Sequence, residues 1–211
     1  MASTIWYYIV LGFESIIGVF GLRLYEEPAY TVLDRPADNV EIRRYAPRLA
    51  AEVDLERAGD VDGQAFGLLF AYISGANRGT SGASQRVAMT VPVDVARPER
   101  IAMTAPVETA PNDRMTRMRF FLPASFNVET APKPSDPRVK IVTVPEQTVA
   151  TLRFTGPGRD LREREQKLIE TLAATRWQPV SAPYGLFYDA PFTIPFLRRN
   201  EAAVNVAPRA G

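Results

Sequence analysis

The chain has 211 residues, a formal net charge of +1 and 46% hydrophobic residues, which suits one globular domain with a sizeable core. It contains neither cysteine nor histidine, which excludes disulfides, thiolate catalysis, Ser-His-Asp triads and histidine ligation of haem or zinc. Because the charge is balanced and forms no basic stripe, we expect no nucleic acid among its partners.

The N-terminal residues 1–26 predict a hydrophobic helix. The stretch from Ile5 to Leu22 (residues 5–22) is interrupted only by Glu14 and Ser15, and a helix of that length spans about 27 Å, close to a bilayer core. No basic residue precedes it and no small-residue cleavage site ends it, which favours an uncleaved membrane anchor over a signal peptide. Arg23 then places the domain in the cytoplasm. The alternative is a soluble cytoplasmic protein whose first helix docks on protein.

The first half of the remaining chain predicts two strands and a helix. Residues 39–45 and 48–55 alternate apolar and polar side chains, and they are joined at Ala46-Pro47. Asp62 is the expected N-cap of a helix that ends near residue 76. Its apolar stripe consists of Phe66, Leu69, Phe70 and Ile73. Residues 77–86 follow as a polar loop.

A near-repeat comes next. Residues 87–93 read VAMTVPV and residues 101–107 read IAMTAPV, so Met-Thr-x-Pro-Val occurs twice, 14 residues apart. The pattern predicts a hairpin in which each proline stands late in its strand. Met89 and Met103 would give a soft apolar wall for a flat hydrophobic ligand, and the alternative is ordinary core packing.

The second half predicts a similar order of elements. Residues 115–122 form a strand, and the proline-rich residues 123–137 form a bridge to two strands at residues 138–144 and 147–154. Asp160 and Glu163 suggest a capping box for a helix that ends near residue 175. Two more strands are expected at residues 184–189 and 202–206.

The two halves share their apolar register when residue i is laid on residue i+99. Val40 then matches Val139, Leu69 matches Leu168, and the motif at Met89 matches Tyr188. We infer two pseudo-repeats, at about residues 39–107 and 138–206. They predict an α+β fold with one antiparallel sheet, closed or nearly closed, and two helices packed on it.

Several motifs together resemble the SOUL haem-binding protein family over about residues 27–206, within the expected domain at residues 27–211. They are Val40-Glu-Ile-Arg-Arg-Tyr45, the two Met-Thr-x-Pro-Val copies, Tyr188-Asp189 and Arg198-Arg-Asn-Glu201. The resemblance implies a distorted antiparallel β-barrel with two helices in β-α-β type repeats, like bacterial effector-binding domains. It also implies non-enzymatic binding of haem or another tetrapyrrole in a hydrophobic groove, for carriage, buffering or sensing.

The resemblance directs the choice of candidate cofactor-binding residues. Without histidine, axial bonding to haem would come from Met89, Met103 or Tyr72. The haem faces would pack against Phe66, Phe70, Met89 and Met103, and Arg78 or Arg86 would meet the propionates. Each residue also has a plain structural alternative, as part of the core stripe or as a loop charge.

Two other functions remain open. One is an effector-binding or protein-interaction module, as an accessory subunit of a membrane complex. The other is a hydrolase that uses carboxylates such as Glu108 or Asp189, although no second catalytic group is placed beside either in the sequence. We therefore expect no enzyme, no catalytic residues and no metal site.

Overall fold

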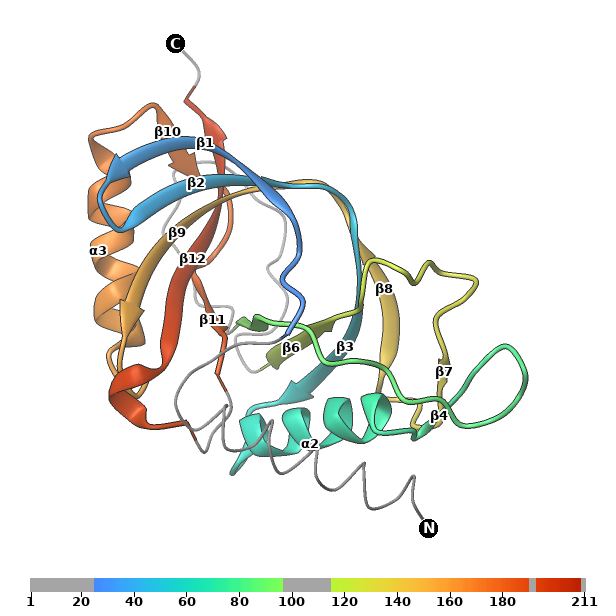
Figure 1. The fold of residues 1–211 in the computed structure, drawn as a ribbon. Helices are drawn as coiled ribbons and strands as arrows, with labels where there is room; N and C mark the ends of the chain where they lie inside the picture. The colour runs from blue at the N-terminus through green and yellow to red at the C-terminus, as the bar shows by residue number, and fades with distance from the viewer. Residues whose placement is uncertain (1–24, 97–114, 190–192, 210–211) are drawn as a thin grey trace.

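The computed structural model describes residues 25–96, 115–189 and 193–209, and it is an α+β structure with one large sheet (Figure 1). The expected N-terminal helix at residues 5–22, the second Met-Thr copy with Met103, and Glu108 lie outside these residues. The strands are β1 (Tyr30–Ala37), β2 (Val40–Tyr45), β3 (Arg48–Glu56), β4 (Asn77–Arg78), β5 (Val93–Ala96), β6 (Met115–Phe121), β7 (Lys133–Pro134), β8 (Lys140–Val144), β9 (Gln147–Thr155), β10 (Trp177–Pro179), β11 (Tyr184–Phe187) and β12 (Arg199–Pro208). The helices are α2 (Val61–Ile73), α3 (Leu161–Ala173) and the short 3-10 helix η1 (Pro195–Leu197).

The large sheet is antiparallel and runs in the order β1-β2-β9-β12-β11-β5-β6-β3-β8, with β10 added to β12. It curls into a half-barrel, as Figure 1 shows. The expected fold class is confirmed in these terms, with one correction. β1 and β8 end the path of described strands and do not pair with each other, so the sheet stays open.

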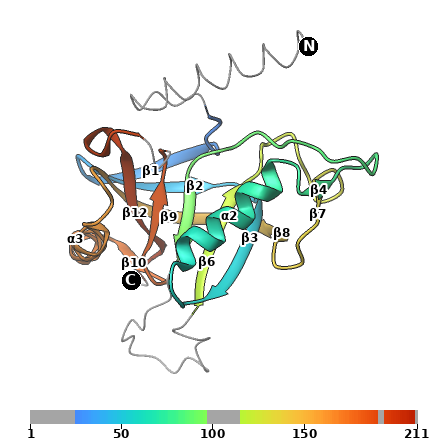
Figure 2. The same ribbon diagram turned by 90° about the horizontal axis from the view of Figure 1, so that it is seen from below.

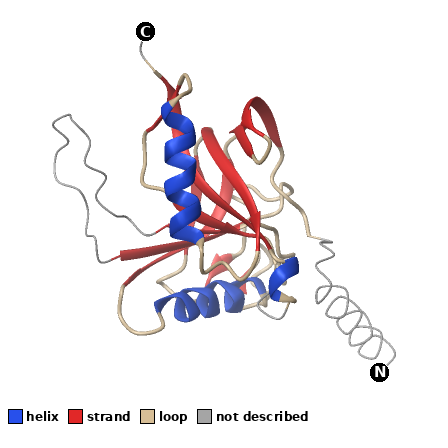
Figure 3. Ribbon diagram, turned by 90° about the vertical axis from the view of Figure 1, so that its left-hand side faces the viewer, coloured by secondary structure: helices blue, strands red, loops and turns tan. Residues whose placement is uncertain are grey.

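Both long helices lie on the outer face of the curled sheet (Figures 2 and 3). α2 packs on β3 and β6, and α3 packs on β9, β10 and β12. The two central strands, β5 and β11, pair with each other between these two sets of strands. The floor between the helices is therefore the β5–β11 seam.

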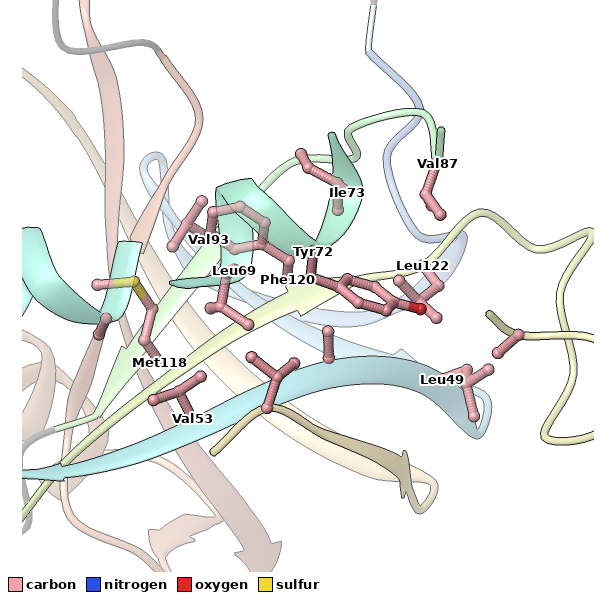
Figure 4. Packing of buried hydrophobic residues seen from close by; sticks show 14 of the residues in the cluster. Leu49, Val53, Leu69, Tyr72, Ile73, Val87, Val93, Met118, Phe120 and Leu122 are labelled. Carbon is pink, nitrogen blue, oxygen red and sulfur yellow. The ribbon is translucent and has the colours of Figure 1, made fainter. Parts of the chain in front are cut away.

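Successive side chains along a strand point to opposite faces of the sheet, and directly paired residues on neighbouring strands point to the same face. The sheet therefore has one face under the helices and one concave face. On β3, Leu49, Ala51 and Val53 are buried under α2 with Leu69 and Phe120 (Figure 4). Under α3, Val40 and Ile42 of β2 pack with Leu152 and Leu168. The intervening residues carry many charged and aromatic side chains toward the concave face.

The first Met-Thr copy differs from the expected hairpin strand. Pro92 precedes β5 instead of standing late in a strand, and both edges of β5 are occupied, by β6 and β11. Thr90 is buried and its hydroxyl donates to the carbonyl of Phe121. The segment is thus anchored by a side-chain hydrogen bond and then enters the central strand of the sheet.

The same element order occurs twice, as β2, β3, α2 and as β8, β9, α3. The first strand of each set pairs outside its own set: β2 pairs with β9, and β8 pairs with β3. The proposed duplication stays a prediction, but its register needs a correction. Met89 lies before β5 whereas Tyr188 lies directly after β11, so these two positions are not equivalent strand ends.

The start of α2 differs from expectation, whereas α3 starts after the expected N-cap residue. The N-cap of α2 is Asp60, not Asp62, and its carboxylate accepts a hydrogen bond of 3.1 Å from the Gly63 amide. Asp160 is the N-cap of α3, but its side chain makes no capping hydrogen bond. Across the described residues, neither α2 nor α3 has the length and apolar character needed to cross a membrane.

Candidate functional site

The outer surface of α2 carries a pair of aromatic rings. Phe66 and Phe70 are one helical turn apart, with ring centroids 6.0 Å apart and planes inclined by 11°. Phe66 also meets Phe120 of the sheet edge-on at 5.4 Å. Phe70 remains 49% exposed, and a side chain at Gly67 would meet open space. We call Phe66, Gly67 and Phe70 the α2 surface.

The loop after α2 folds back on the end of the helix. The Asn77 amide donates to the carbonyls of Tyr72 and Gln85 at 2.6 and 2.7 Å, and the Val87 amide donates to Ile73 at 2.9 Å. These bonds fix the segment that carries Arg78 and Arg86, which are both exposed. The loop therefore holds the two arginines near the C-terminal end of α2.

Met89 and Tyr72 have different surroundings. Met89 is partly buried and packs against the same core cluster as Phe66. Tyr72 is 1% exposed, and its hydroxyl donates to the carbonyl of Pro132 at 2.9 Å (Figure 4 shows its ring in the core). Burial raises the pKa of Tyr72 to about 12. Tyr72 therefore supports the core under α2 and presents no surface to a ligand.

A cleft of about 640 Å³ lies between the two long helices. Its floor includes Val95 of β5 and Phe187 of β11, and α3 contributes Leu161 and Ile169. Charged side chains stand at its mouth, among them Arg159 and Arg162. Asp62 of α2 reaches this cleft, but none of the predicted cofactor-binding residues within the described part of the chain lines it.

The concave face holds a buried ionic cluster that was not expected. Glu201 is 0% exposed and accepts hydrogen bonds from Arg43 at 2.7 Å, Arg199 at 2.8 Å and the Tyr188 hydroxyl at 2.7 Å. Burial opposes its ionisation, but the hydrogen bonds and charges of the two arginines hold the pKa of Glu201 below its usual value. Arg199 also meets Glu27 at 3.0 Å, so the cluster fixes the start of the described chain.

A second buried polar group lies nearby on the same face. Asp94, with a side chain 9% exposed, borders a small cavity with Arg48, Tyr45 and Tyr184. Its Oδ1 atom has no hydrogen-bond partner, and Arg119 approaches the other oxygen at 3.7 Å. Burial raises the pKa of Asp94 to about 6, against the attraction of Arg119 and Arg48.

Sequence reasoning missed both clusters because alternate polar residues on a strand indicate a solvent-facing side. In this half-barrel that side is the curled interior. The signal available in the sequence was the high density of arginine and glutamate on or next to predicted strands, with Arg43, Glu52 and Arg119 on them and Glu201 directly before one.

Of the two carboxylates considered for catalysis, Asp189 lies in the described part of the chain. Asp189 accepts a hydrogen bond of 2.6 Å from the Arg199 amide, a role in fixing backbone. Within residues 25–96, 115–189 and 193–209, no three acidic side chains gather in a way that could hold a metal ion.

Comparison with known families gives the affiliation. The family model described as "SOUL heme-binding protein" matches residues 25–205, most of the chain. The chain belongs to the SOUL haem-binding protein family. This confirms the resemblance seen in the motifs, and the family description is that of a binding protein. No curated protein sequence matches the chain.

Solved structures share the fold of this SOUL family member at low sequence identity. The EcmrR C-terminal domain has 10% identity and a TM-score of 0.59, over 85% of this chain and 99% of that one. A hydrolase from Listeria innocua has 12% identity and a TM-score of 0.57, over 82% and 93%. These likenesses show a common fold and leave the activity to be argued from the site.

The exclusion of nucleic acid was wrong. EcmrR in its complex with DNA also has this fold, with 11% identity and a TM-score of 0.59 over 99% of this chain, which spans 65% of the EcmrR chain. The net charge is a sum over the whole molecule and does not report how cationic side chains are distributed on its surface. Balanced charge is therefore no ground for excluding a DNA-associated role for this fold.

Proposed function

We propose that the protein binds haem or a related tetrapyrrole on the α2 surface without catalysing a reaction. The observation that carries the proposal is the stacked pair of Phe66 and Phe70 on a helix of a SOUL family member, in which Phe70 is half exposed and Phe66 packs against the core. A flat apolar ligand gains most from an aromatic surface that is already ordered. Arg78 and Arg86, near the end of the helix, supply charge-assisted donors for carboxylates.

The residues of the α2 surface suit packing against the flat face of a tetrapyrrole better than they suit strong axial ligation of its iron. The chain has no histidine or cysteine, so its own axial donors are methionine and tyrosine. Met89 is partly buried beside the cluster that supports Phe66, whereas the Tyr72 hydroxyl is engaged by Pro132. Haem would supply redox chemistry when bound, and the chain would supply an apolar face, two cations and at most a thioether.

The first prediction concerns haemin binding. Titration of the full chain with haemin should give a saturable Soret shift with about one site per chain. Replacing Phe70 by alanine removes the exposed ring and should raise Kd about tenfold, the equivalent of 1.4 kcal/mol. Absorption spectra of wild type and Phe70→Ala at equal protein concentrations measure this.

The matched control is Phe196→Ala, because Phe196 is also an exposed phenylalanine and belongs to η1 instead of α2. It should bind haemin as the wild type does. Equal weakening in both variants would mean unspecific partitioning onto exposed rings, and an unchanged Kd in Phe70→Ala would remove the α2 surface from the proposal.

A second candidate is an effector-binding module whose ligand occupies the cleft between the helices. The cleft volume of about 640 Å³ and the fold shared with the EcmrR C-terminal domain favour it. Ile169→Arg would fill the cleft from α3. If Ile169→Arg loses haemin binding while Phe70→Ala keeps it, the binding site is the cleft and not the α2 surface.

We also propose that residues 5–22 attach the protein to a membrane, with the domain in the cytoplasm. The length and apolar composition of the segment support this, and Arg23 supports the orientation. The full chain should stay in the membrane pellet after a carbonate wash. Complete release by carbonate would instead favour a segment that docks on protein.

A further inference from the structure

An exposed apolar turn lies just before β12. It consists of Ile194, Pro195, Phe196 and Leu197, which we call the apolar tip, and it contains η1. Phe196 is 72% exposed, more than any other large apolar side chain in the described residues. Pro195 is also exposed, whereas Ile194 and Leu197 are partly buried. Single exposed apolar residues are common on protein surfaces, but an ordered turn of four apolar residues with an exposed phenylalanine at its centre requires a cause.

The apolar tip is held in shape by its own hydrogen bonds. The Leu197 amide donates to Ile194 at 2.9 Å, and the Arg198 amide donates to Pro195 at 3.3 Å. The Arg198 guanidinium adds a bond of 2.8 Å to the Thr193 carbonyl. Proline at the first position of the turn also restricts the backbone. Phe196 is thus presented outward by an ordered turn.

The apolar tip lies beside the start of the described chain. Arg199, three residues after Phe196, binds Glu27 at 3.0 Å and the buried Glu201 at 2.8 Å. Figures 2 and 3 show η1 and the beginning of the described chain at the same end of the molecule. The apolar residues 5–22 end five residues before Glu27, and five extended residues reach at most about 18 Å.

We propose that the apolar tip is a membrane contact that inserts Phe196 into the lipid interface beside residues 5–22. The inference rests on the proposed membrane attachment and adds a second point of contact to it. One flexible attachment leaves a domain free to rotate, whereas two contacts tied through Arg199 and Glu27 fix which side faces the bilayer. Apolar side chains on a surface element bind a bilayer by burial at the boundary between headgroups and acyl chains.

The absence of cysteine makes a direct test possible. Phe196→Cys gives a single labelling site for the fluorophore NBD, whose emission rises and shifts to the blue in an apolar environment. Val128→Cys is the matched control, since Val128 is 67% exposed on the segment between β6 and β7. Each labelled full chain is reconstituted with phosphatidylcholine vesicles and separated by flotation.

The expected result is a blue shift and quenching by doxyl-labelled lipid at position 196, with neither effect at position 128. If the protein floats with vesicles and the label at 196 stays in water, the tip contact is refuted while the membrane attachment stands. If the protein does not float, both fail. A shift at 196 that grows with protein concentration in the absence of lipid would assign the tip to contact between copies instead.

Discussion

Glu201 shows how charge is stabilised inside the half-barrel. A lone buried carboxylate would be strongly disfavoured, but two guanidinium groups and one phenol hydroxyl surround this one. Tyr188 is buried with it, and Arg199 lies 3.8 Å above the Tyr188 ring. The cluster joins β2, β12 and the residue after β11 to Glu27, so ionic contacts add to the apolar packing on the concave face.

Asp94 predicts an unusual dependence of stability on pH. Its folded pKa of about 6 lies above the ordinary value of 3.8, so the folded state binds this proton more tightly than the unfolded state. Asp94 should therefore increase the free energy of unfolding as pH falls from about 6 to about 4, and this contribution should be lost as pH rises again. The contribution is at most about 3 kcal/mol.

The measurement is urea unfolding of wild type and Asp94→Asn across this pH range. Other carboxylates titrate in both proteins, and Glu201, with its lowered pKa, acts in the opposite direction. The difference between the two curves therefore isolates Asp94, and the variant should gain relative stability as pH rises toward 7. A difference independent of pH would mean that Asp94 titrates normally.

At the scale of elements, α2 and α3 sit in similar places but present different outer surfaces. The exposed positions of α2 include Gly63, Gly67 and Phe70, whereas the exposed positions of α3 include charged residues such as Arg162 and Lys167. An amphipathic helix such as α3 is stable with its polar side in water. The apolar exterior of α2 supports the binding role proposed for this helix.

The two helix starts offer a matched pair of substitutions. Asp60→Ala removes a side-chain bond to the Gly63 amide and should lower the free energy of unfolding by about 1 kcal/mol. Asp160→Ala removes a residue at the same position of α3 that makes no such bond, so its effect should be clearly smaller. Urea denaturation of both variants measures this, and equal losses would contradict the capping assignment.

The sequence predicted β2, β3, β9 and both long helices well because each has a clear apolar period and a turn residue at its end. It predicted the N-cap residue of α3, Asp160, but not that of α2, since Asp60 and Asp62 both suit an N-cap and backbone geometry decides between them. Among the site residues, Phe66 and Phe70 were found from helical spacing, but the same spacing could not show that Phe70 is half exposed. The buried ions depend on the sheet curling, which periodicity within a single strand does not report.

At the scale of the whole molecule, the seam between β5 and β11 joins the strands beneath α2 to those beneath α3. Gly185 of β11 lets the Phe187 ring lie close to the backbone: an added Cβ would stand 2.8 Å from that ring and 2.9 Å from Leu161. Both neighbours belong to the cleft between the helices. The absence of a side chain at Gly185 therefore allows α3 and Phe187 to lie this close to β11.

Two glycine substitutions should have opposite signs. Gly185→Ala should lower the free energy of unfolding by about 1–3 kcal/mol through overpacking at the seam. Gly67→Ala, where the added methyl meets open space on α2, should raise it by about 0.5–1 kcal/mol. Thermal unfolding of both variants provides the comparison. Stabilisation by Gly185→Ala would contradict this prediction, because it would mean that the seam accommodates the added methyl group without strain.

β2 pairs with β9 and β3 pairs with β8, so strands of the first half pair with strands of the second half. This pairing has a consequence during synthesis. When the ribosome has delivered β2, β3 and α2, each of these strands still lacks one neighbour that is encoded about a hundred residues later. Helices and local strand pairs can form early, whereas these long-range pairings close last and slowly. The nascent first half therefore leaves the ribosome with open strand edges, and the second half completes the sheet.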